Sequence, residues 1–167
     1  MAHSASVRMQ TQSWRRPGEW LLMALLIVIL LLVFMRYVRQ VQGQSELAAI
    51  KSTVGTLRTA LVIDHLQRQV SPSKDPSMLS ARNPFELVKQ KPVNYLGVVS
   101  KAQAASVPPG SWVFEENCPC VGYQPLDHLW LDSPSSDPMI WFEVTGMPGV
   151  LQLVPVEKYR WNNEWVD

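Results

Sequence analysis

Two cysteines separated by a single proline form the most reactive pattern in the chain, Cys118-Pro119-Cys120. Such a pair can close a small disulfide ring, pair with another chain, stay as two thiols, or bind a metal. Zinc would need two further ligands, and Asp127 and His128 follow nearby. Because proline stiffens the pair and the chain has no second cysteine pair, we favour a disulfide over metal or redox chemistry.

Aspartates and histidines offer further candidate ligands. Asp127, Asp132 and Asp137 are spaced by five residues in a segment rich in proline and serine. Oxygen ligands in a flexible loop would suit Ca²⁺, but the spacing matches no calcium-loop signature, so we interpret these aspartates as turn residues. The histidines are scattered and are expected to be solvated or structural: His3, His65 and His128.

Larger catalytic patterns are missing from the sequence. It contains no glycine-rich phosphate loop, no Ser/His/Asp order and no paired-carboxylate pattern. We therefore expect a non-enzymatic protein without a cofactor or metal. The net charge of +1, with 17% charged residues, argues against a nucleic-acid binder, which needs a clustered basic surface.

An apolar segment near the N-terminus must position the rest of the chain. Residues 20–35, WLLMALLIVILLLVFM, carry no charge. A bilayer core needs about 20 helical residues, and the run reaches that length when Trp20 and Tyr37 lie at the interfaces and Arg36 snorkels. The sequence therefore predicts a single transmembrane anchor at residues 19–38, and membrane lipid is its first partner.

A cleaved signal peptide is the competing interpretation of this segment. Its apolar region usually spans about 7–15 residues and ends in small residues, whereas this run is longer and ends in Phe-Met-Arg-Tyr-Val-Arg. Arg15-Arg16 suggests a twin-arginine signal, but the following Pro17-Gly18-Glu19 fits that pattern poorly. We favour an uncleaved anchor. The distribution of basic residues before and after the apolar segment slightly favours a cytoplasmic tail at residues 1–18 and a C-terminal domain outside the cytoplasm.

The helix is expected to continue past the membrane as an amphipathic segment over residues 39–70. Five apolar residues spaced by 3, 4, 3 and 4 predict one buried stripe: Leu47, Ile50, Val54, Leu57 and Leu61. The stripe can pack on the chain's own C-terminal domain or against partner helices. We favour the own domain for residues 47–66 and partners for residues 20–43. Gly43 and Gly55 each weaken the helix by up to ~1 kcal/mol.

Proline is concentrated in the C-terminal part of the chain, which predicts strands and loops. Roughly 95 residues remain after the long helix, enough for one small domain. We expect a linker at residues 71–109 and an antiparallel sheet domain at 110–167. The linker should hold a short helix over residues 80–89, with Asn83 as N-cap and Pro84 at the first helical position, and then an extended connector.

Strands of the sheet domain are expected where apolar residues alternate with polar ones: residues 110–115, 129–132, 139–145 and 150–156. Residues 146–149 predict a hairpin loop, and Pro155 restricts its strand to an edge or end. Of the seven tryptophans, we assign Trp112, Trp130 and Trp141 to the core. Trp161 and Trp165 are expected to cap the sheet or form a contact patch. The predicted class is α+β, with a long transmembrane helix continuing into a small antiparallel sheet domain.

Three short motifs carry a family resemblance: Asn-Pro-Phe at residues 83–85, Pro-Val-Asn-Tyr-Leu-Gly at 92–97 and Pro-Gly-Ser-Trp-Val-Phe at 109–114. With the order of the parts, they resemble type IV pilins and type II secretion pseudopilins, most closely those of MSHA-type pilus biogenesis. The resemblance implies a subunit in the inner membrane with a periplasmic domain. It also implies other pilin or pseudopilin subunits and inner-membrane assembly proteins as partners.

Two departures from the pilin pattern concern processing and polymerisation. Prepilins usually carry glycine followed by phenylalanine or methionine at the cleavage point, but here Gly18 is followed by Glu19 and Trp20. Met23 stands where such proteins carry the glutamate that aligns subunits. The resemblance therefore implies an accessory or minor subunit that stays anchored. The alternative is a membrane-anchored periplasmic protein with a redox or metal role at Cys118 and Cys120.

Overall fold

The computed structural model describes residues 15–70, 83–146 and 152–166. The chain divides into two units, Met1–Gln42 and Gly43–Asp167, called here the anchor unit and the sheet unit. Helix α1 (Arg15–Val70) contributes to both. The class is therefore α+β, with one long apolar N-terminal helix followed by a small sheet.

The described part of the anchor unit is helical, and its apolar residues are exposed on every side. Large apolar side chains between Trp20 and Met35 are 51% to 75% exposed. This segment makes α1 long and apolar enough to cross a membrane. In water such a surface would be costly, at about 25 cal/mol per Å² of exposed apolar area, so the segment requires an apolar environment.

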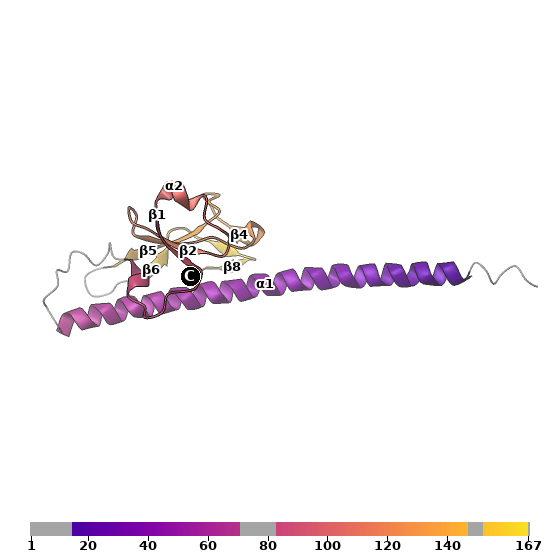
Figure 1. Ribbon diagram of the computed structural model, residues 1–167, viewed down its shortest axis with the longest axis horizontal. Helices are drawn as coiled ribbons and strands as arrows, with labels where there is room; N and C mark the ends of the chain where they lie inside the picture. The colour runs from indigo at the N-terminus through magenta and orange to yellow at the C-terminus, as the bar shows by residue number, and fades with distance from the viewer. Residues whose placement is uncertain (1–14, 71–82, 147–151, 167) are drawn as a thin grey trace, which may run out of the picture. The chain divides into compact units, whose positions relative to one another are not determined.

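In the sheet unit, the later part of α1 supplies one side of the hydrophobic core (Figure 1). The predicted stripe is between 1% and 5% exposed and packs with aromatic side chains from the sheet: Leu47, Ile50, Val54, Leu57 and Leu61. Arg58 Nε also donates a hydrogen bond to the carbonyl of Leu153 at 2.9 Å. Burial of each such aliphatic side chain contributes about 1.5–3 kcal/mol, which fixes this face of the helix on the sheet.

The main sheet has five strands in the order β1-β2-β3-β5-β6. Their bounds are β1 (Tyr95–Val99), β2 (Trp112–Glu115), β3 (Cys120–Tyr123), β5 (Ile140–Thr145) and β6 (Gln152–Pro155). Alternate residues of β5 are buried, namely Ile140, Phe142 and Val144, because successive side chains point to opposite faces. Pro155 ends β6 at an edge of the sheet, where its missing N–H removes no interior ladder bond.

A second, three-stranded sheet has the order β4-β7-β8, from β4 (Leu131–Asp132), β7 (Arg160–Trp161) and β8 (Glu164–Trp165). Asn162 and Asn163 join β7 to β8 with φ of 47° and 72°, the left-handed pair that a tight hairpin needs. The short helices of the sheet unit are η2 (Pro84–Glu86), α2 (Lys101–Ala104) and η3 (His128–Trp130).

The described strand pairs within residues 110–167 are antiparallel, as predicted, but β1 precedes this range and pairs with β2 in parallel, so the main sheet is mixed. Parallel neighbours need a crossover, and the segment containing α2 supplies it. The sheet also begins earlier than residue 110, since β1 lies within the expected linker. Strand β3 was not predicted. The expected helix over residues 80–89 is only η2, and residues 80–82 and most of the expected hairpin loop lie outside the described residues.

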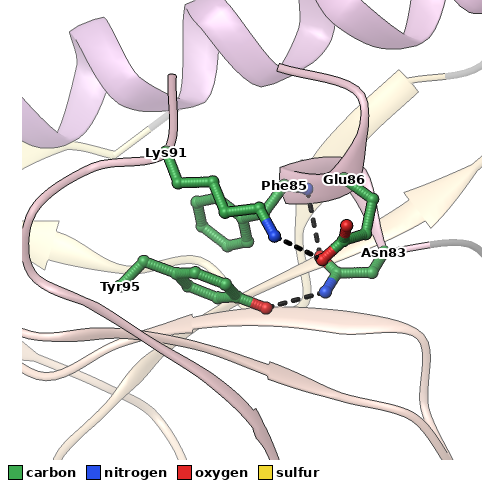
Figure 2. A network of polar contacts seen from close by, with 5 residues as sticks. All are labelled: Asn83, Phe85, Glu86, Lys91 and Tyr95. Atoms are coloured by element: carbon green, nitrogen blue, oxygen red, sulfur yellow. Dashed lines mark hydrogen bonds and ion pairs between the residues drawn. The ribbon is translucent and has the colours of Figure 1, made fainter. Parts of the chain in front are cut away.

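A polar network joins η2 to β1 (Figure 2). Asn83 Oδ1 accepts from the Phe85 N–H at 3.0 Å, so Asn83 caps η2, and its Nδ2 donates to the Tyr95 hydroxyl at 2.7 Å. The Phe85 and Tyr95 rings stack 4.1 Å apart, while Lys91 pairs with Glu86 at 2.6 Å. Burial raises the pKa of Tyr95. These contacts attach the segment before β1 to the sheet.

Candidate functional site

Glu46 places a buried carboxyl group next to the apolar stripe of α1. The residue is 5% exposed and lies four positions before Ile50, on the same face of the helix. Its Oε1 accepts from the Tyr123 hydroxyl at 2.8 Å and from the Leu126 N–H at 2.9 Å. Its Oε2 has no hydrogen-bond partner among the described residues. The carboxyl group therefore ties α1 to β3 and to the loop that follows.

Two buried tyrosines of the sheet unit have raised pKa values. Burial, followed by the hydrogen bond to Glu46 and its charge, raises the pKa of Tyr123 far above 10. Burial likewise raises the pKa of Tyr159 to about 12, against a smaller lowering from the Trp141 N–H that donates to its hydroxyl. Both hydroxyls stay protonated at neutral pH, so Tyr123 remains a donor to Glu46.

Gly43 opens the sheet unit, and neighbouring side chains leave little room for a Cβ. A Cβ there would lie 2.9 Å from Asn162 Nδ2 and 3.2 Å from the Trp130 ring. The Gly43 carbonyl accepts from Trp161 Nε1 at 2.8 Å. The helical cost of glycine at this position is offset by close contact with two indole rings, which lie 5.8 Å apart.

Cys118 and Cys120 are joined by a disulfide in the turn between β2 and β3. Cys118 is partly exposed, whereas Cys120 is buried on β3. The buried Glu115 carboxylate accepts from the Cys118 N–H at 2.9 Å, and Cys120 lies opposite Glu115 and Glu143 in the sheet register. Nearby carboxylates disfavour a thiolate, so this environment suits a structural disulfide better than thiol exchange.

The candidate metal ligands serve as local structure. Asp127 caps η3 by accepting from the Leu129 N–H, and Asp137 accepts from the Met139 N–H and from Trp141 Nε1. Asp132 lies opposite Arg160 in the register of β4 and β7. In residues 15–70, 83–146 and 152–166, no three His, Cys, Asp or Glu side chains converge to hold a metal ion.

The two histidines that the structure describes lie on different elements, His65 on α1 and His128 on η3. His128 Nε2 lies 3.4 Å from Gln124 Nε2 on an exposed turn, and His65 is partly exposed on α1. His3 lies outside the described residues.

The tryptophans divide differently from the prediction. Trp112 is in the core, and so is Trp161, at 1% exposed, although we expected Trp161 to cap the sheet or form a contact patch. The Gly43 contact explains this burial, because the close approach of α1 encloses the ring. Trp130 and Trp141 are only partly buried. Trp165 is 51% exposed, with the Arg160 guanidinium 5.2 Å from its ring centre.

Sequence reasoning missed Glu46, Gly43 and Glu115. Glu46 had a usable signal, since it is a lone acidic residue four positions before Ile50, on the face of the helix that carries the apolar stripe. Gly43 was noted only as a weak point of the helix.

Comparisons with protein-family models, curated proteins and solved structures find no match. The functional interpretation therefore depends on the residues of this chain.

Proposed function

We propose that this chain is a non-enzymatic, pilin-like accessory or minor subunit in the assembly of an MSHA-like type IV pilus or a type II secretion pseudopilus. In this proposal it crosses the inner membrane once, with residues 1–18 in the cytoplasm and the sheet unit in the periplasm. Its partners are other pilin or pseudopilin subunits and inner-membrane assembly proteins.

The observation that carries the proposal is the change of surface along helix α1. Its early part exposes large apolar side chains all round, whereas its later part buries one stripe under a sheet of the same chain. An all-apolar helix needs lipid or other helices around it. A helix of this kind, with a small sheet attached to its far part, can join a bundle of similar helices while presenting the sheet outside the membrane.

The accessory role is supported by the junction before the apolar segment. Gly18-Glu19-Trp20 is a poor prepilin cleavage site, and Met23 provides no carboxylate to pair with the amino terminus of a neighbouring subunit. A subunit that keeps residues 1–18 cannot leave the membrane freely. The proposal is therefore of a helper held beside a fibre.

A redox or metal role at the cysteines is the second candidate, and the partly exposed Cys118 is the observation in its favour. Disulfide exchange needs an accessible sulfur and a stabilised thiolate leaving group. The partial exposure of the Cys118 residue favours the first condition. The second is opposed by the carboxylates of Glu115 and Glu143 beside Cys120, so we rank this role below assembly.

In-cell photocrosslinking tests the assembly role. Ile27→benzoylphenylalanine places a photocrosslinking probe in the apolar segment. Ile63→benzoylphenylalanine places a second probe on the later part of α1, at a residue that is 49% exposed. We expect Ile27 to form adducts with proteins that carry an apolar N-terminal helix. Adducts with lipid alone would contradict the proposal. Deleting the gene should also abolish fibre assembly or secretion, and the Cys118→Ser, Cys120→Ser double variant should restore it.

A further inference from the structure

We propose that Glu115 is a positioning residue for closure of the disulfide between Cys118 and Cys120. Its carboxylate folds the turn while both cysteines are still thiols, which shifts the equilibrium between the thiol and disulfide forms towards the disulfide. The proposal concerns the sheet unit alone. It needs neither the membrane anchor nor a pilin-like partner, so its failure would leave the proposed function untouched.

The first observation is that the Glu115 carboxylate binds three donors of the turn that follows it. Glu115 ends β2 and is 4% exposed. Its Oε1 accepts from the Asn117 N–H at 3.2 Å and from Asn117 Nδ2 at 2.7 Å, and its Oε2 accepts from the Cys118 N–H at 2.9 Å. Hydrogen bonds to a charged acceptor are roughly twice as strong as neutral ones. Both carboxylate oxygens are therefore used to hold the turn.

The second observation is that the main chain of the turn does not hold itself. Among the described residues, no main-chain group of residues 116–119 makes a hydrogen bond with another main-chain group. Pro119 has no N–H to donate. The Glu115 carboxylate is therefore the acceptor that bends residues 116–118 back towards β2.

Cysteines two positions apart can be joined only where the backbone is bent. In an extended chain their Cα atoms would lie about 6.6–7.2 Å apart, at the upper limit of about 6.8 Å for a disulfide. The Cα atoms of Cys118 and Cys120 lie 5.2 Å apart, and Cys120 is fixed on β3 opposite Glu115 in the register. A contact that holds this bend in the thiol form reduces the entropy lost on closure, and so raises the effective concentration of one thiol at the other.

Closure needs an oxidant, and a small disulfide such as glutathione disulfide is sufficient. The thiolate of the partly exposed Cys118 attacks one sulfur of glutathione disulfide, which forms a mixed disulfide and releases one glutathione thiolate. The Cys120 thiolate then attacks the Cys118 sulfur, which forms the internal disulfide and releases the second glutathione thiolate. Both protein thiols are oxidised, one glutathione disulfide is reduced, and the two protons end on the glutathione thiols.

Glu115 acts on this reaction in two opposite ways. Through the Cys118 N–H it places the Cys118 sulfur for the second attack, whereas its negative charge disfavours the attacking Cys120 thiolate. The charge slows the attack, while the placement favours the product. The position of the equilibrium does not depend on the rate of attack, so an equilibrium measurement reports the placement.

The test equilibrates the full chain in detergent with mixtures of glutathione and glutathione disulfide, and reads the disulfide fraction by mass spectrometry after alkylation of the thiols. Glu115→Gln keeps the shape of the side chain, removes its charge and replaces one acceptor oxygen with a donor. We expect the effective concentration of the thiols to fall about tenfold, which equals a rise of ~30 mV in the reduction potential.

The matched control is Glu143→Gln. Glu143 lies opposite Cys120 on the other neighbouring strand, is exposed, and makes no side-chain hydrogen bond to the turn among the described residues. This variant removes a charge near Cys120 without removing a contact of the turn, so the effective concentration should change by less than about twofold. A fall of the same size in both variants would assign the effect to charge and would overturn the proposal.

Unfolding separates positioning from a purely structural role. Coupling between two features is reciprocal, so Glu115→Gln should lower the urea midpoint more in the disulfide-bonded chain than in the Cys118→Ser, Cys120→Ser background. Equal losses in both backgrounds, with an unchanged reduction potential, would overturn the proposal. If Glu115→Gln fails to fold, Asn117→Ala removes one donor to the carboxylate and keeps the Cys118 contact. It should lower the effective concentration about threefold, and an unchanged value would overturn the proposal.

Discussion

The hydrogen bond between Glu46 and Tyr123 gives a quantitative prediction about how α1 is held on the sheet. Tyr123→Phe removes the donor, and Glu46→Ala removes the acceptor and leaves a buried hydroxyl unpaired. Each single change should destabilise the sheet unit by about 1–3 kcal/mol. The loss for Glu46→Ala is moderated, because the alanine also removes Oε2, a buried oxygen with no partner among the described residues.

A double-mutant cycle isolates the pair. Urea unfolding of the full chain in detergent, followed by tryptophan fluorescence, should give midpoints lower by about 0.5–1.5 M for each single variant, given slopes near 2 kcal/mol/M. The coupling free energy between Glu46 and Tyr123 should be about 1–2 kcal/mol. The control cycle pairs Glu46→Ala with Tyr159→Phe, whose hydroxyl accepts from the Trp141 N–H. Those two changes should add to within ~0.5 kcal/mol.

The reasoning would be refuted if the Glu46–Tyr123 coupling were no larger than the control value. That result would mean that the hydrogen bond between the Glu46 carboxyl group and the Tyr123 hydroxyl does not help to hold helix α1 on the sheet. A slope that changed between variants would instead report a change in the unfolded or folded surface, and the cycle would then be repeated by thermal unfolding.

Three further predictions concern backbone, pH and disulfide. Gly43→Ala should destabilise the sheet unit by about 1–3 kcal/mol through overpacking. Gly55→Ala, with open space around it, should stabilise the sheet unit by up to ~1 kcal/mol. Urea midpoints of the two variants that moved in the same direction would contradict this prediction. The raised pKa of Tyr159 stabilises the fold fully below pH 10, and this contribution is lost as pH rises towards 12, so Tyr159→Phe should flatten the loss of unfolding free energy between pH 9 and pH 12. The Cys118→Ser, Cys120→Ser variant should lose only about 1–2 kcal/mol because the closed loop is short, and a loss above about 4 kcal/mol would count against that account.

Periodicity in the sequence predicted which face of the long helix is buried. The spacing of Leu47, Ile50, Val54, Leu57 and Leu61 places them on one stripe, and the structure puts that stripe in the core of the sheet unit. Periodicity identifies a buried face without identifying what covers it; the expected packing of this stripe on the chain's own C-terminal domain, favoured over partner helices, is confirmed by the shared core.

Other parts of the fold had no signal of this kind. Strands β4, β7 and β8 have two residues each, which is too short to show an alternation of apolar and polar residues. The parallel pairing of β1 depends on a crossover, which local sequence does not reveal. Glu46 is buried because Tyr123 and Leu126 arrive from more than seventy residues away to bind it. For Glu46 the deciding contacts are therefore distant in the sequence.

The mass of the intact protein recovered from membranes tests the permanent anchor most directly. Our account predicts that the chain retains residues 1–18 after carbonate washing of the membranes, because Gly18-Glu19-Trp20 is a poor processing site. A chain that begins at Glu19 would contradict it, since that product would show prepilin processing and would release the helix to enter a fibre.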